Sequence, residues 1–179
     1  KGPIFANFVL ADEINRTSPK TQAALLEAME EHNVTFDGVT YDLPHPFITM
    51  ATQNPMGSAG TQPLPESQLD RFMICLSIGY PNLEKQIEII KSRRYDNPIE
   101  RIKEVASKEN VIEVQNYLSS VRISDDALKY IVLLCEKTRE MPLVELGVSP
   151  RGVLALVQMA KAHAVLEDRI YVIPEDVQY

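Results

Sequence analysis

The chain has 179 residues, of which 45% are hydrophobic and 24% are charged, a balance typical of folded globular proteins and unlike disordered or fibrous chains. Its net charge of −7, with no dense run of Lys and Arg, argues against electrostatic wrapping of nucleic acid. No apolar run approaches the roughly 20 residues that span a bilayer, so we expect no membrane span. Cys75 and Cys135 lie in apolar stretches without metal-ligand spacing, which predicts buried thiols in a reducing, cytoplasmic setting.

Residues 4–80 alternate between strand and helix patterns, which is typical of an α/β sheet. The nearly all-apolar run 4–11 predicts a strand covered on both faces. Ser18 and Pro19 predict the start of a helix that reaches about Glu31. The turn at Asp37-Gly38 predicts a hairpin between 34–36 and 39–41. Further buried strands are expected at 47–52 and 72–78, with a Pro- and Gly-rich loop between them.

After Pro81 the pattern predicts helices only, with apolar stripes in 83–90, 111–118, 128–135 and 154–164. The sequence thus predicts a partial α/β core over residues 1–94 and a small all-α domain over 95–179, with a linker near 95–98. A strand directly after the Lys-Gly-Pro start, and a helix start at Pro174 close to the last residue, lead us to expect a fragment of a longer protein.

Two adjacent carboxylates, Asp12 and Glu13, follow the first predicted strand. Ligands of open α/β folds bind at the carboxyl edge of the sheet, where this pair would lie. Asp12 could hold a hard cation such as Mg²⁺, and Glu13 could orient an attacking water. The alternative, favoured if this motif is taken alone, is a solvated strand end.

Three further polar residues stand near predicted element ends. Asn54 follows the 47–52 strand and could polarise a water or a phosphate oxygen, or simply form a turn. Arg71 precedes the 72–78 strand and could meet a transferring phosphoryl group, or pair with a nearby acid. Arg151 lies in the first turn of a helix, where a cation is mildly disfavoured unless an anion lies nearby; a solvated cation is the alternative.

Taken together, these motifs resemble the AAA+ ATPase module in order and spacing, and their local amino-acid sequences resemble the MoxR family within it. The resemblance covers essentially the whole chain and is most specific over residues 3–72. The segments that carry it are VLADEINR (9–16), TQAALLEAM (21–29), ATQNP (51–55), LPESQLDRF (64–72) and SPR (149–151).

The resemblance implies an ATP site that uses Mg²⁺, with a role for each matching residue. Asp12 and Glu13 match the Walker B pair, Asp12 as metal ligand and Glu13 for the hydrolytic water. Asn54 matches sensor 1, Arg71 the arginine finger that acts on ATP held by the next protomer, and Arg151 sensor 2 of the lid domain. It also implies hexameric rings, chaperone-like remodelling or metal loading of proteins, and partners with von Willebrand factor A domains. The 34–41 hairpin corresponds to a device that often faces substrate.

One feature departs from the family pattern: the 179 residues contain no Gly-rich phosphate loop ending in Gly-Lys-Ser/Thr. Without that loop the phosphates lack their main cradle, so we expect this chain alone to be inactive. Two alternatives therefore remain: a related nucleic-acid motor or chelatase subunit, and a non-catalytic assembly module. A hydrolase triad has little support, because His32, His45 and His163 have no evident nucleophile partner and are expected at the surface or in loops.

Overall fold

The computed structural model describes residues 2–54, 63–93 and 98–178. Within these ranges the elements are, in chain order, β1 (Phe8–Ala11), a 3₁₀ turn (Ile14–Arg16), α1 (Pro19–Glu31), β2 (Asn33–Phe36), β3 (Val39–Asp42), β4 (Ile48–Ala51), α2 (Glu66–Leu69), α3 (Leu83–Arg93), a second 3₁₀ turn (Pro98–Arg101), α4 (Lys108–Ser120), α5 (Asp125–Glu140), α6 (Pro150–Leu166) and α7 (Pro174–Gln178). The α/β class with a following helical domain, expected from the sequence, is confirmed. The proposed boundary at 94–95 and most of the linker lie outside the described residues.

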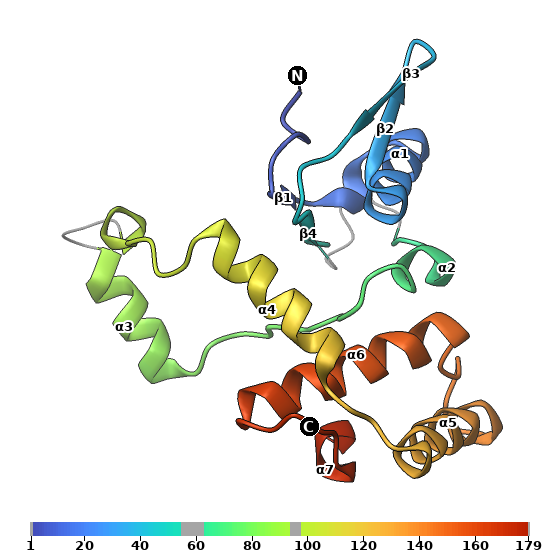
Figure 1. Cartoon of the computed structure of the whole chain (residues 1–179). Coiled ribbons are helices and arrows are strands. Elements are labelled where there is room, and N and C mark those ends of the chain that lie inside the picture. Colours follow the sequence, from blue (N-terminus) through green and yellow to red (C-terminus); the bar gives the residue numbers. More distant parts are fainter. Residues whose placement is uncertain (1, 55–62, 94–97, 179) are drawn as a thin grey trace.

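Two short sheets form in the described part of the first region. β1 and β4 pair in parallel with Phe8 opposite Ile48 and Ala11 opposite Ala51. β2 and β3 form the predicted antiparallel hairpin around Asp37 and Gly38, which both have positive φ (49° and 75°) as this turn requires. Figure 1 shows α1 beside the hairpin at one end of the molecule, with α5, α6 and α7 grouped at the other.

Helix α1 begins where Ser18 and Pro19 predict it. The Ser18 side chain accepts a hydrogen bond from the Thr21 backbone N–H, which satisfies one of the free donors of the first turn. Leu26 and Ala28 are each 1% exposed and anchor the helix in the small core of this region. The C-cap, His32, adopts a left-handed conformation at the surface. Local signals therefore fix both the start and the inward face of α1.

Two strand predictions need correction. β1 is half exposed, with Phe8 at 56% and Leu10 at 62%, because no described layer packs against that face of the β1–β4 sheet. Residues 72–78 form no strand: they run as a bend and an irregular segment in which Ile78 is 98% exposed. Their apolar, β-prone composition is not enough, since a strand needs a neighbouring strand to accept its backbone hydrogen bonds. Cys75 in this segment is exposed, contrary to the prediction, whereas Cys135 is buried as expected.

The helical region has its own core between α5, α6 and α7. Its buried members are Val121, Ile131, Cys135, Ala160, Ala164, Val172 and Val177. Burial raises the pKa of the Cys135 thiol, in spite of the opposing charge of Arg139. The predicted helix start at Pro174 is confirmed as α7, which packs against α6 and α5. This region therefore has its own apolar centre, separate from the core around α1.

A buried carboxylate holds α7 in place. The Asp176 side chain, 0% exposed, accepts hydrogen bonds from both terminal nitrogens of Arg169 and from the Ile173 backbone N–H, and its Oδ1 lies 2.7 Å from His163 Nδ1. The hydrogen bonds from Arg169 are the largest cause that holds the pKa of Asp176 far below its usual range. His163 was expected at the surface or in a loop, but it lies on α6 with a side chain only 17% exposed, because it faces this carboxylate.

Candidate functional site at the sheet edge and the α2–α6 contact

The parallel pairing of β1 with β4 brings two sets of polar residues to one edge. Both strands end at the same level, with Ala11 opposite Ala51. Asp12 and Glu13 continue the chain from β1, and Thr52 and Asn54 continue it from β4. Parallel pairing therefore brings the acid pair and the amide to the carboxyl edge of the sheet, as expected from the sequence.

Thr52 ties the two strand ends together. Its hydroxyl donates a hydrogen bond to Asp12 Oδ1 at 2.6 Å and accepts one from the Glu13 backbone N–H at 2.8 Å. Its backbone N–H donates to the Ala11 carbonyl and its carbonyl accepts from the Ile14 N–H, both at 3.0 Å. One threonine thus orients the Asp12 side chain and the Glu13 backbone. The sequence motif contained Thr52, but a single Thr after a strand carries no signal for this role.

The side chains of Glu13 and Asn54 face each other. Asn54 Nδ2 donates to Glu13 Oε1 at 3.3 Å, a long hydrogen bond, and the other carboxylate oxygen of Glu13 pairs with Arg16. Asn15, only 5% exposed, accepts from the Asn54 N–H at 3.2 Å and donates to the Asn54 carbonyl at 3.1 Å. The Asn15 amide thereby fixes the backbone of Asn54, a role that sequence reasoning missed.

Glu13 has an uncommon backbone conformation, with φ and ψ both 48°. In this left-handed region the Cβ of an L-residue crowds the following carbonyl, at about 1–2 kcal/mol per residue. The Thr52 contact to the Glu13 N–H and the 3₁₀ turn that follows hold the conformation. Strained residues persist where surrounding structure over-determines them, and such positions cluster at functional sites.

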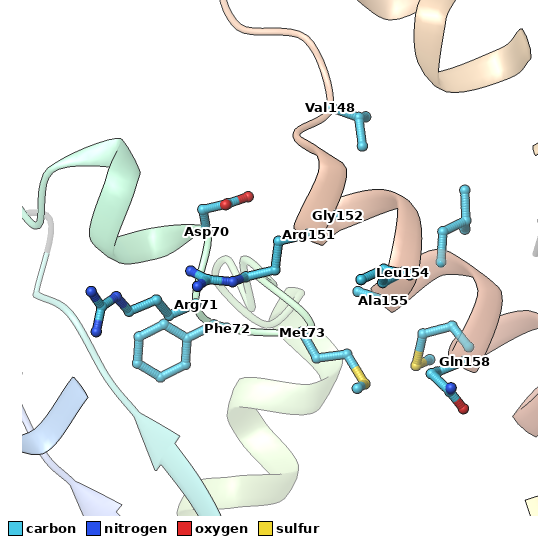
Figure 2. A pocket seen from close by; sticks show the side chains of 12 residues that line it. Asp70, Arg71, Phe72, Met73, Val148, Arg151, Gly152, Leu154, Ala155 and Gln158 are labelled. Carbon is cyan, nitrogen blue, oxygen red and sulfur yellow. The ribbon is translucent and has the colours of Figure 1, made fainter. Parts of the chain in front are cut away.

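The other two predicted residues, Arg71 and Arg151, meet at a common partner. Arg71 follows α2, and Arg151 lies in the first turn of α6; Figure 2 shows the two side chains on facing elements. Arg71 Nη1 lies 2.9 Å from Glu30 Oε2, and Arg151 Nη2 pairs with Glu30 Oε1. Glu30, near the end of α1, was not predicted, because a residue 41 positions from Arg71 and 121 from Arg151 gives no local signal.

A second contact joins α6 to the turn after α2. The Ser149 hydroxyl caps α6 by accepting from the Gly152 N–H at 2.9 Å, and it donates to Asp70 Oδ1 at 2.6 Å. A pocket of about 480 Å³ lies between this turn and α6, lined by residues of 70–73 and 148–159 (Figure 2). The structure therefore places the five predicted residues in two groups: Asp12, Glu13 and Asn54 at the sheet edge, and Arg71 with Arg151 at the α2–α6 contact.

The donor set at the sheet edge suits a magnesium ion. Mg²⁺ is a hard cation that is usually held by one or two carboxylates together with water and phosphate oxygens. The exposed Asp12 carboxylate offers one such ligand, since the Thr52 hydroxyl engages only Oδ1. Among the described residues, no three His, Cys, Asp or Glu side chains gather into a metal cluster. An ion at Asp12 would accordingly complete its shell from solvent and substrate. No helix in the described part of the chain is both long and apolar enough to cross a membrane.

The sequence matches two family models and several known proteins. Residues 1–74 match the family described as "ATPase family associated with various cellular activities (AAA)", and residues 136–179 match the AAA lid domain. The chain is 53% identical over 99% of its length to the uncharacterized protein YeaC of Bacillus subtilis and 38% identical over 98% to the chaperone MoxR1 of Mycobacterium tuberculosis.

A solved structure agrees with both matches. The crystal structure of an ATPase candidate from Cytophaga hutchinsonii aligns with a TM-score of 0.88 and 41% identity over 99% of the chain. The chain covers 56% of YeaC, 48% of MoxR1 and 57% of that solved chain, so it spans about half the length of the relatives it matches. The family models, the relatives and the solved structure therefore confirm the resemblance to AAA+ ATPases of the MoxR family that the sequence motifs indicated.

Proposed function

We propose that this chain supplies part of a Mg²⁺-dependent ATP hydrolysis site. Asp12 is the metal ligand, Glu13 orients the attacking water, Asn54 is sensor 1, Arg71 is the arginine finger and Arg151 is sensor 2. The observation that carries the proposal is the sheet-edge network, in which Thr52 and Asn54 hold Asp12 and Glu13 side by side.

The side chains at the edge divide the work. The bound ion would neutralise phosphate charge, and Asp12 keeps one carboxylate oxygen oriented by Thr52 and the other available as ligand. Glu13 accepts a hydrogen bond from the water that attacks, and the Asn54 amide positions this carboxylate without adding charge. Arg71 and Arg151 supply cationic donors for phosphate oxygens, and their meeting at one carboxylate suggests that they act on the same anion.

The family supports a setting for this chemistry. AAA+ ATPases typically oligomerise, and a finger that serves the next protomer needs a ring, which we propose to be hexameric. Because MoxR1 is named a chaperone, we propose chaperone-like remodelling of partner proteins. Metal loading, partners with von Willebrand factor A domains and a cytoplasmic setting are further parts of the proposal, and they rest on the resemblance to the MoxR family. The net charge of −7 disfavours nucleic acid as the substrate. The absence of a Gly-rich phosphate loop from the 179 residues supports weak ATP binding by this chain alone.

The test is a steady-state ATPase assay on the full-length protein with the Glu13→Gln variant. We expect kcat to fall by about 10²- to 10⁴-fold, the usual contribution of a positioned acid–base group. Arg71→Ala should lower kcat by about 10³-fold or more. Glu31→Gln, which makes the same change at an exposed acid of α1, is the matched control and should leave turnover unchanged. Wild-type turnover in Glu13→Gln would refute the assigned roles.

A further inference from the structure

Glu30 links three separate segments through one carboxylate. It lies near the end of α1, and its two oxygens each receive one guanidinium, Arg71 from the turn after α2 and Arg151 from the first turn of α6. Arg71 contacts Glu30 through Nη1, and Arg151 contacts it through Nη2. A guanidinium has five donors in a fork that fits carboxylate and phosphate oxygens in the same way. The Glu30 oxygens therefore accept from these guanidinium groups in the same way as phosphate oxygens would.

Glu30 is shared between two cations. One carboxylate faces two guanidinium groups, and the positive end of the α6 dipole lies at Arg151. Asp70, which lines the neighbouring pocket with both arginines, and Glu27, which lines the cavity of Glu30 and Arg71, are further acids nearby. The side chains are 34% exposed for Arg71, 38% for Glu30 and 45% for Arg151, so water and ions reach them. Half-exposed ion pairs are weak and are screened by salt. A polyanion could therefore displace Glu30 without a large penalty.

The contact between α6 and the α2 turn does not depend on Glu30 alone. The Ser149 hydroxyl donates to Asp70 Oδ1 at 2.6 Å, and these two residues stand two positions before Arg151 and one before Arg71. If the arginines left Glu30, this bond would still hold the start of α6 near the turn. The arginines could then change partner while their backbones stay close together.

The geometry points to Glu30 as a positioning residue that holds Arg71 and Arg151 as a pair and is exchanged for a phosphate group when ATP engages them. This inference rests on the proposed function, because it assigns the phosphate to ATP. Glu30 touches no substrate in the engaged state; it acts through the two arginines. Because ATP must compete with this carboxylate, the apparent affinity for ATP is reduced by the fraction of arginines held at Glu30.

The first experiment measures KM and kcat for ATP in the full-length protein with Glu30→Gln. We expect KM to fall about two- to tenfold with kcat within about twofold of wild type, as expected for loss of two half-exposed ion pairs that compete with substrate. The difference in KM should shrink at high salt, because salt screens the wild-type pairs. Glu27→Gln is the matched control: Glu27 lies one turn earlier on α1 and lines the same small cavity as Glu30 and Arg71. Its KM should equal that of wild type.

A second measurement does not require activity. Hydrogen exchange of the backbone amides in 66–72 and 149–152 should become about two- to tenfold faster in Glu30→Gln and stay unchanged in Glu27→Gln, because the ion pairs that join both segments to α1 go to Glu30. Unchanged exchange in both variants would overturn the role of Glu30, whatever the ATPase result. An unchanged or raised KM in Glu30→Gln, or an equal fall in both variants, would also overturn it. Loss of the proposed function shows separately, as normal turnover in Glu13→Gln.

Discussion

The buried carboxylate of Asp176 makes a strong prediction about the stability of the helical region. In Asp176→Asn the side chain keeps its shape but loses its charge, so Arg169 and His163 lose their anionic partner. Breaking a buried pair by removing one partner costs about 3–5 kcal/mol. We expect about 3 kcal/mol, the low end, because the Arg169 side chain is 21% exposed and can reach water. Glu175→Gln, at an exposed acid one residue earlier in α7, should change stability by less than about 0.5 kcal/mol.

The assay is urea unfolding of wild type and both variants between pH 3 and pH 8. The pKa of Asp176 is lowered in the folded protein, so its contribution is fully present above the unfolded pKa of about 3.9 and is lost as pH falls toward the folded pKa. The difference between wild type and Asp176→Asn should therefore shrink as the pH falls below about 4. A loss below about 1 kcal/mol at pH 7, or a difference that grows between pH 4 and pH 3, would refute this account.

Two further outcomes follow from the helical region. Ser149→Ala removes both the cap of α6 and the hydrogen bond to Asp70, so it should destabilise the protein by about 1–2 kcal/mol in the same assay. The loss should exceed that of Ser107→Ala, which removes only the side-chain cap of α4. Equal losses would contradict a role for the Asp70 contact. Folded protein treated with iodoacetamide at pH 8 should gain one adduct, at the exposed Cys75, because burial and a raised pKa protect Cys135; mass spectrometry showing equal rates would exclude this.

The fold could be predicted where the signal is local. Ser18, Ser124 and Ser149 each accept a hydrogen bond from the first turn of a helix, as their position before Pro or acidic residues predicts. The Asp37-Gly38 turn likewise specifies its hairpin from two residues. The predicted strand at 72–78 is wrong. Strand pairing depends on distant segments of the chain, which a run of apolar residues does not reveal.

The site was predictable in part for the same reason. Asp12 stands directly after β1 and Asn54 three residues after the end of β4, so parallel pairing brings both to one edge. The hydroxyl of Thr52 and the carboxylate of Glu30 could not be assigned, since their roles depend on partners 39 to 121 positions away and on side-chain directions that spacing does not encode. The meeting of Arg71 with Arg151 depends likewise on how α6 docks against the α2 turn.

The backbone at position 13 bears on how this sequence was selected. Glycine, or asparagine at lower strain than most residues, would occupy φ 48° and ψ 48° more comfortably than glutamate does. A sequence chosen for folding alone would place one of them there. The chain instead has glutamate in a left-handed backbone conformation, and the Thr52 contact to the Glu13 N–H helps to hold it there. The proposed role of Glu13 gives a physical reason for this choice, because it requires a long carboxylate at a position where glycine would fold with less strain.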